Sequence, residues 1–183
     1  MGGIIYGSYF FYKKWRKKQM INDSLHGVND PNFNGGVALS GFSLQSVASY
    51  IASFEGFSET PYWDVKQWSW GYGTAAGYDH NNKPLGTITQ TEAMQDLINF
   101  LEILYEKTMM ELEKPVTSSQ LKALLDFGYN LGFGDLKKIL ININNGYSAE
   151  QVANEIKLYV YAGGSVSEDL VSRRDSEATI YLT

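Results

Sequence analysis

Two helix-start signals in the second half of the sequence restrict the fold more than any other feature. Residues 89–92 (TQTE) and 117–120 (TSSQ) both have the capping-box pattern, in which Thr and a Glu or Gln three residues later bind backbone N–H groups of the first helical turn. The first box predicts a long helix that is broken by Pro115, and the second predicts a helix with one apolar face. That face consists of Leu121, Leu124, Leu125 and Gly128.

Further helices are predicted after these two. The pattern indicates helices near residues 135–143 and 149–160, separated by a turn at Asn145-Gly146, and a last helix after Gly163-Gly164. One stripe of the last helix contains Leu170, Arg174, Glu177 and Tyr181. Because an isolated buried charge is costly, the arginine and the glutamate should pair, either with each other or with Glu55.

The segment before residue 89 combines one helix with a small β region. Apolar residues at helical spacing predict a helix over about residues 43–56, with Leu44, Val47, Ile51 and Phe54 on its core-facing stripe. Glu55 would lie on the same stripe, where burial disfavours a charged carboxylate. Further along, strand alternation places Asp64 on the same face as Tyr62.

The stretch WSWGYG, residues 68–73, has aromatic and small residues in alternation. Trp68, Trp70 and Tyr72 should share one face, while Ser69, Gly71 and Gly73 share the other. Since that second face is almost bare of side chains, we expect a ligand to be able to approach the backbone there.

Glu55 and Asp64 are a pair of carboxylates suited to the cleavage of glycosidic bonds. That reaction uses one carboxyl group near apolar side chains and one carboxylate near water. A sugar ring also needs a flat aromatic surface, which Trp63, Trp68, Trp70 and Tyr72 would provide. Two simpler interpretations stay open: the tryptophans are core residues, and Glu55 is a helix-end residue that reaches solvent.

Composition excludes several other kinds of site. The 183 residues suffice for one domain with a core and contain no cysteine, so a disulfide framework or a thiolate metal site is impossible. His26 and His80 are isolated and lack metal-ligand spacing, and we predict neither a metal nor a cofactor. The net charge is −5 although residues 1–20 have five basic residues and no acidic one. The rest is therefore strongly acidic, which argues against nucleic-acid binding by the main domain.

The N-terminal residues form a separate segment. Residues 2–12 are apolar and aromatic and are followed directly by KKWRKK, whereas about 20 apolar residues are needed to span a bilayer. We therefore predict an arm over residues 1–20 that either anchors at a membrane surface or packs on a partner protein. Residues 21–41 are rich in Asn, Asp, Gly and Ser and are predicted to be a linker, so that the folded domain covers residues 42–183.

Three segments in order resemble the phage-type lysozymes, the endolysin muramidases of glycoside hydrolase family twenty-four. FEGFSETPYWDVKQWSWGYGT (54–74) resembles the family's Glu, Asp and Gly-x-Gly signature, LKALLDFGYNLGFG (121–134) its Phe-Asn-x-Gly segment, and AGGSVSEDLVSRRDSEATIYL (162–182) its last helix. The resemblance implies a mostly helical α+β fold with two lobes: a small β-hairpin lobe, a long linking helix and a helical C-terminal lobe, with the cleft between the lobes.

The resemblance also implies roles for individual residues. Glu55 would be the general acid, Asp64 would activate the attacking water, and Ser69 takes the place of the family's Thr, one residue closer to Asp64 than usual. Thr74 stands where many members have His after Gly-x-Gly. Trp70, Tyr72, Thr74, Tyr129 and Asn130 would bind substrate, and Arg174 and Glu177 would support the site. The substrate would be peptidoglycan, cut between N-acetylmuramic acid and N-acetylglucosamine, by a protein located in a virion, at a membrane or in the lysing host.

Two alternatives remain at this level. A lytic transglycosylase would cut the same bond with one Glu and leave an anhydro sugar, and Asp64 argues against it. A non-catalytic virion protein or glycan-binding protein could retain the lysozyme fold, which the acidic charge and Ser69 permit.

Overall fold

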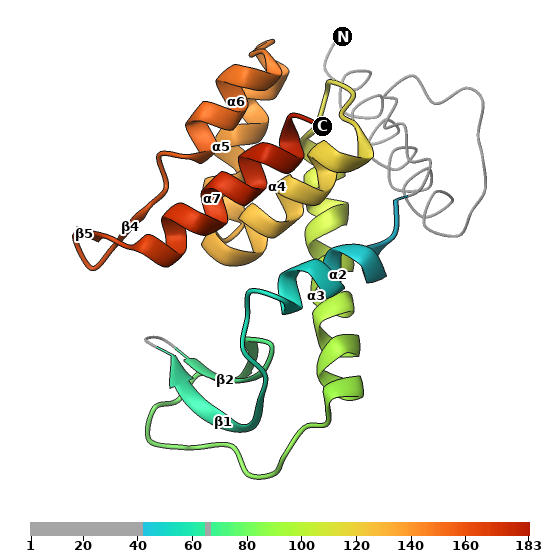
Figure 1. The fold of residues 1–183 in the computed structure, drawn as a ribbon. Coiled ribbons are helices and arrows are strands. Elements are labelled where there is room, and N and C mark those ends of the chain that lie inside the picture. Colours follow the sequence, from blue (N-terminus) through green and yellow to red (C-terminus); the bar gives the residue numbers. More distant parts are fainter. Residues whose placement is uncertain (1–41, 65–66) are drawn as a thin grey trace, which may run out of the picture. The chain divides into compact units, whose positions relative to one another are not determined.

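The computed structural model describes residues 42–64 and 67–183, which form two compact units, 42–104 and 105–183 (Figure 1). The predicted arm and linker, residues 1–41, lie outside the described residues. Within the described ranges, no helix is both long and apolar enough to cross a bilayer.

The unit 42–104 begins with helix α2 (Leu44–Ala52), which is shorter than the predicted helix over 43–56. Ser43 caps it by accepting a hydrogen bond from the backbone N–H of Ser46. After Ala52, the N–H groups of Ser53 and Phe54 bind carbonyls only three residues back, so the chain tightens into a turn and leaves the helix. Leu44, Val47 and Ile51 are buried as predicted, but Phe54 is 40% exposed, so its assignment to the core face was wrong.

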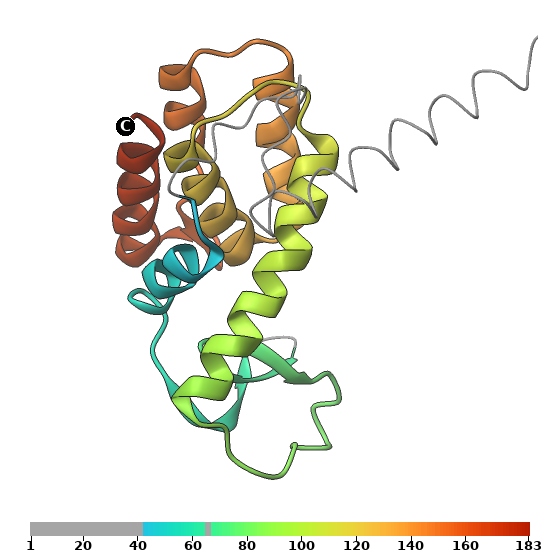
Figure 2. The same ribbon diagram turned by 90° about the vertical axis from the view of Figure 1, so that its right-hand side faces the viewer.

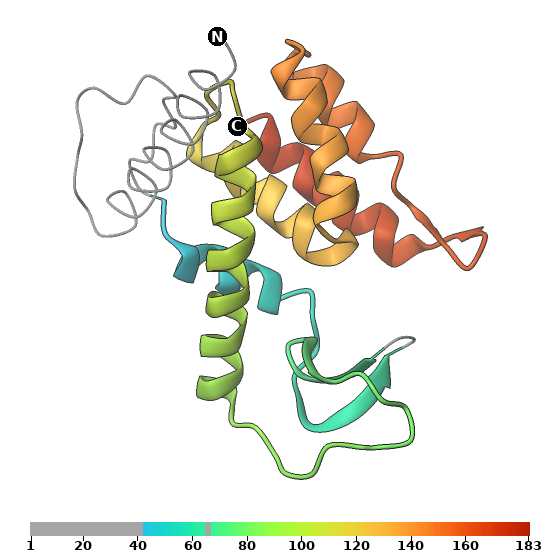
Figure 3. The same ribbon diagram turned by 180° about the vertical axis from the view of Figure 1, so that it is seen from behind.

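A three-stranded antiparallel sheet follows, in the order β1 (Ser58–Asp64), β2 (Gln67–Gly71) and β3 (Thr74–Gly77). At the end of β1 the register places Tyr62 opposite Ser69, Trp63 opposite Trp68 and Asp64 opposite Gln67. Seen from behind, the chain leaves β3 in a long loop that runs to the start of α3 (Figure 3).

Helix α3 (Gln90–Glu111) starts at the predicted capping box and ends before Pro115, as expected. The Thr89 N–H donates to Glu92 Oε2 at 2.9 Å, and the Glu92 N–H donates to Thr89 Oγ1 at 3.2 Å. Its residues up to Leu104 belong to the first unit and the rest to the second.

The unit 105–183 is a helical bundle with one small hairpin. It contains the helices α4 (Ser118–Leu131), α5 (Phe133–Asn144), α6 (Ala149–Ile156) and α7 (Glu168–Tyr181). Helices α4 and α6 each pack against both α5 and α7 (Figure 2). The second capping box is present, with Thr117 and Gln120 each bonded to the other's backbone N–H. The apolar face predicted for this helix is buried, and the core also includes Phe127, Leu136, Ile139, Leu140, Val152 and Ile156.

Two details of this unit differ from the sequence-based expectation. Helix α6 ends at Ile156, not near residue 160, and it is followed by a hairpin of β4 (Tyr161–Ala162) and β5 (Ser165–Val166). Gly163 (φ 58°) and Gly164 (φ 85°) form its turn. Two consecutive residues with left-handed backbone conformation match the twist of a tight hairpin, and glycine adopts this conformation readily. The glycine pair therefore forms the turn of a hairpin, whereas the sequence analysis placed it only before the last helix.

Candidate active site

Glu55 lies just beyond the end of α2 and is partly buried. Its backbone N–H donates to the carbonyl of Ile51 at 3.1 Å, which ties it to the last helical turn. Because Ile51 is completely buried, this turn holds the backbone of Glu55 at a fixed place while its side chain remains accessible.

Tyr62 shows that the two predicted catalytic carboxylates lie close to one region of the sheet. Its side chain is 40% exposed and shares a strand face with Asp64, as alternation predicted. Burial raises the pKa of the Tyr62 phenol, and the negative charges of Asp64 and then Glu55 raise it further. The Tyr62 phenol therefore lies within electrostatic range of both carboxylates.

Four polar side chains share this face of the hairpin. Asp64 lies opposite Gln67, and Tyr62 lies opposite Ser69, so the four form two adjacent cross-strand pairs. The Gln67 Nε2 donates to Ser69 Oγ at 3.0 Å. Ser69 has no exposed surface, whereas Gln67 is partly accessible and Asp64 is exposed.

The expectation that the small-residue face of β2 is open to a ligand was wrong at Ser69 and Gly71. Gly71 (φ 57°) packs against α3, and a Cβ atom added there would lie 2.7 Å from the Cβ of Ala93. Ala93 is completely buried. The missing side chain therefore allows a helix to approach the strand closely, which is a packing role.

The tryptophans lie on the opposite face from Asp64. Trp63 packs edge-on against Trp68, and His80 contacts both rings, with its plane nearly parallel to Trp68. The Trp68 Nε1–H donates to the Asp79 carbonyl, and Lys83 Nζ lies 5.5 Å from the Trp68 ring. These two tryptophans thus hold the loop after β3 against the sheet, which is the structural interpretation left open by the sequence.

The other predicted substrate-binding residues of this unit, Trp70, Tyr72 and Thr74, do not all lie on the strand face of Asp64. By alternation along β2, Trp70 shares a face with Trp68 and not with Asp64. Tyr72 packs on Phe57 with ring centroids 5.6 Å apart. Thr74 begins β3 opposite Trp70, and its Oγ1 is buried without a hydrogen-bond partner among the described residues.

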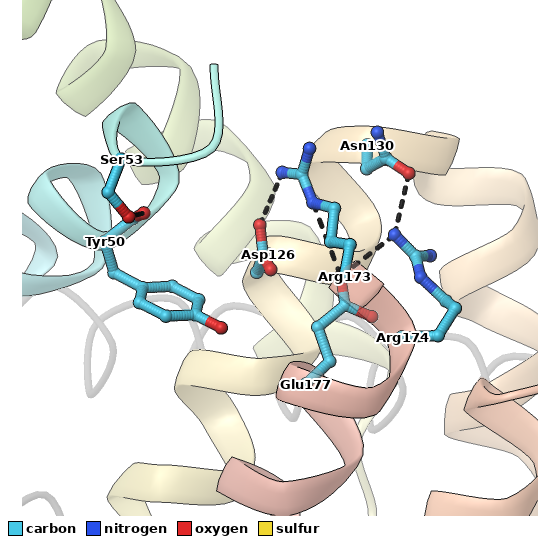
Figure 4. Close-up of polar contacts among 7 residues, drawn as sticks. All are labelled: Tyr50, Ser53, Asp126, Asn130, Arg173, Arg174 and Glu177. Carbon is cyan, nitrogen blue, oxygen red and sulfur yellow. Dashed lines mark hydrogen bonds and ion pairs between the residues drawn. The ribbon is translucent and has the colours of Figure 1, made fainter. Parts of the chain in front are cut away.

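The remaining predicted residues lie in the unit 105–183, where Arg174 and Glu177 pair as expected, at 3.0 Å between Nη2 and Oε1 (Figure 4). Arg174 also donates to Asn130 Oδ1 at 2.7 Å and lies over the Phe127 ring. Asn130 and Tyr129 are partly exposed on α4. Asn130 is therefore held by an arginine of another helix, which fixes the direction of its amide.

Two charged residues that sequence analysis did not single out complete this cluster. Arg173 donates to Asp126 Oδ1 at 2.6 Å, and its Nε lies 3.6 Å from Glu177. Burial raises the pKa of Glu177 to about 9, with Asp126 adding to the shift and the arginines Arg174 and Arg173 opposing it. The sequence analysis placed only Arg174 on the buried stripe of the last helix, so it missed both Arg173 and its partner Asp126 on α4.

Gln67 was also missed. Alternation from Asp64 cannot identify its cross-strand partner until the length of the hairpin loop is known. Within residues 42–64 and 67–183, no group of three or more His, Asp and Glu side chains is placed to hold a metal ion.

Two phage endolysins are similar to this chain in sequence. The chain is 33% identical over 143 residues to an endolysin of Bacillus phage B103, which covers 76% of this chain and 53% of that protein. It spans about half the length of the two Bacillus phage endolysins it matches.

Two solved structures have a similar fold. An endolysin from the Escherichia coli phage FAHEc1 is 26% identical and aligns with a TM-score of 0.65, covering 78% of this chain and 94% of that one. The muramidase domain of SpmX from Asticaccaulis excentricus has the same fold, with a TM-score of 0.67 at 23% identity over 78% of this chain and 99% of that domain. The sequence profile of the phage lysozyme family matches residues 52–177, and the chain therefore belongs to the phage lysozyme family.

Proposed function

We propose that this chain is a peptidoglycan hydrolase, a muramidase that cuts the β-1,4 bond between N-acetylmuramic acid and N-acetylglucosamine. Membership of the phage lysozyme family supports this assignment. The observation that carries it is that the family match over residues 52–177 includes both Glu55 and Asp64, which lie just before strand β1 and at its end, one partly buried and one exposed.

In the proposed reaction Glu55 is the general acid. It gives its proton to the leaving glycosidic oxygen while Asp64 accepts a proton from the water that attacks the sugar carbon. The exposure of Asp64 suits its role, since the base must reach water. The exposed phenol of Tyr62, on the same strand face as Asp64, would contact the substrate.

We further propose that Tyr72, Tyr129 and Asn130 bind the glycan strand. The hydrogen bond from Arg174 would keep the Asn130 amide ready to contact an acetamido group. Substrate binding by Trp70 and Thr74 stays a prediction from the sequence. For Trp70, its position on the opposite strand face from Asp64 does not support this role.

The proposed place of action is the bacterial cell wall, as for an endolysin. Residues 1–20 would add an attachment to a membrane surface or a virion protein, because they combine aromatic residues with five basic side chains. This arm would position the enzyme and take no part in bond cleavage.

The test compares Glu55→Gln with Glu59→Gln in zymograms on purified peptidoglycan. Glu59 is an exposed glutamate four residues away on β1 and serves as a matched control. Loss of general acid catalysis should reduce lysis by roughly 10²- to 10⁴-fold in the first variant only. Equal lysis by both variants would remove Glu55 from the mechanism, and absence of lysis by the unmodified chain would reject the function.

A further inference from the structure

The hydroxyl of Ser69 is not accessible in this structure. Ser69 has no exposed surface, and its Oγ already accepts a hydrogen bond from Gln67 Nε2. A water molecule on the Asp64 side of the strand therefore cannot reach the hydroxyl while Gln67 occupies this position.

Gln67, and not Ser69, is the polar residue beside Asp64 that solvent can reach. It lies directly opposite Asp64 across the strand pair, so both side chains project from the same face. Asp64 is exposed and Gln67 is partly exposed, which gives both side chains access to solvent.

The amide of Gln67 has a defined orientation because one end is fixed. Its Nε2 is committed to Ser69, so the Oε1 atom, on the other arm of the planar amide, is left as a hydrogen-bond acceptor. A carboxylate is also an acceptor. Two acceptors side by side are suited to bind both protons of one water molecule, which leaves a lone pair on its oxygen for attack.

We propose that Gln67 holds the attacking water together with Asp64, and that Ser69 is a positioning residue which anchors the Gln67 amide. This inference rests on the proposed hydrolase function. In the step, the water oxygen bonds to the anomeric carbon and its proton passes to Asp64. The glycosidic bond breaks, and the leaving oxygen takes the proton of Glu55.

The products of the reaction report directly on this water. When water is not held at the anomeric carbon, the C6 hydroxyl of the same muramic acid can attack instead. The product is then a 1,6-anhydro sugar, lighter than the hydrolysis product by one water. A change that affects only folding or glycan binding alters the rate and leaves this ratio unchanged.

The experiment measures kcat, KM and the ratio of anhydro to reducing products, by mass spectrometry, for the full chain with Gln67→Met. Methionine keeps the length of the side chain and removes its carbonyl. We expect kcat to fall by roughly 10²-fold, because the attacking water is misplaced, with KM nearly unchanged and the anhydro fraction increased. Ser69→Ala should shift the ratio in the same direction by less, and the exposed helix variant Gln95→Met should resemble the unmodified chain.

Two results would overturn the inference. One is an unchanged kcat and product ratio in Gln67→Met, and the other is a larger shift in Ser69→Ala than in Gln67→Met. If Gln67→Met does not fold, as judged by circular dichroism, Gln67→Asn replaces it, because the shorter side chain withdraws the carbonyl while it stays polar. A chain that releases no muropeptides at all would instead reject the proposed function, and the inference with it.

Discussion

Replacing Gly71 with alanine should destabilise the unit 42–104 through two separate effects. The residue has φ 57°, and an L-residue in that region costs about 1–2 kcal/mol. The new Cβ would also lie 2.7 Å from the Cβ of Ala93 and 3.4 Å from its Cα, where the neighbour is a helix backbone that cannot yield easily. Overpacking of this kind costs about 1–3 kcal/mol, so the total loss should be about 2–5 kcal/mol.

A double-mutant cycle separates the two effects. Gly86→Ala is the control for conformation alone, since Gly86 has φ 107° and no atom within 4 Å of the added Cβ. Ala93→Gly should cost about 1 kcal/mol by itself because of its helical position. In the variant with both Gly71→Ala and Ala93→Gly, the space for the methyl group returns and the packing share is recovered.

The assay is urea unfolding followed by circular dichroism for the four variants and the unmodified chain. A coupling free energy of about 1–3 kcal/mol between the two changes is expected, since residues in contact are not additive. If Gly71→Ala is no more costly than Gly86→Ala, or if the two changes add independently, the close approach of α3 to β2 is refuted.

The buried cluster and the N-terminal arm give the remaining predictions. Arg174→Ala should lower the free energy of unfolding by about 1–3 kcal/mol, because it removes the hydrogen bond to Asn130 and the polar partner that lies 3.0 Å from the buried Glu177 carboxyl; an unchanged melting temperature would instead indicate a substrate contact. The pKa of Glu177 is raised in the folded chain to about 9 from 4.5, so its contribution to stability is complete below about pH 4.5 and is lost as the pH rises towards 9. Glu177→Gln should therefore flatten the stability profile measured by denaturation across this range, and parallel profiles would contradict the raised pKa. A chain that begins at Leu39 should digest purified peptidoglycan but no longer co-sediment with anionic vesicles, since each lost basic residue is worth about 1 kcal/mol at such a surface. Vesicle binding by the shortened chain would show that the arm is not the anchor.

Helix starts were the part of the fold most accessible to sequence analysis. The capping boxes at Thr89 and Thr117 are local, because each involves residues only three positions apart. Helix ends were less accessible: α2 and α6 both end about four residues before the predicted position. The hairpin after α6 was missed because strands of two residues are too short to show alternation.

For the site, alternation correctly placed Tyr62 and Asp64 on one face, but it could not tell which face is covered. That depends on contacts between distant residues, such as Gly71 with Ala93. The sequence analysis therefore assigned the small-residue face of β2 to ligand binding, whereas this face packs against helix α3. In the same way, the position of Gln67 depends on the register of the hairpin, which a single strand pattern does not contain.

The distribution of tryptophan gives the chain a built-in optical probe of one unit. The sequence has four tryptophans, and the three that the structure describes, at positions 63, 68 and 70, all lie in the unit 42–104. In a Trp15→Phe background, fluorescence would report the melting of this unit alone, whereas ellipticity at helical wavelengths would be dominated by α4 to α7 of the other. Coincident transitions would show that the two units unfold as one cooperative body, and separated transitions would give the stability of each.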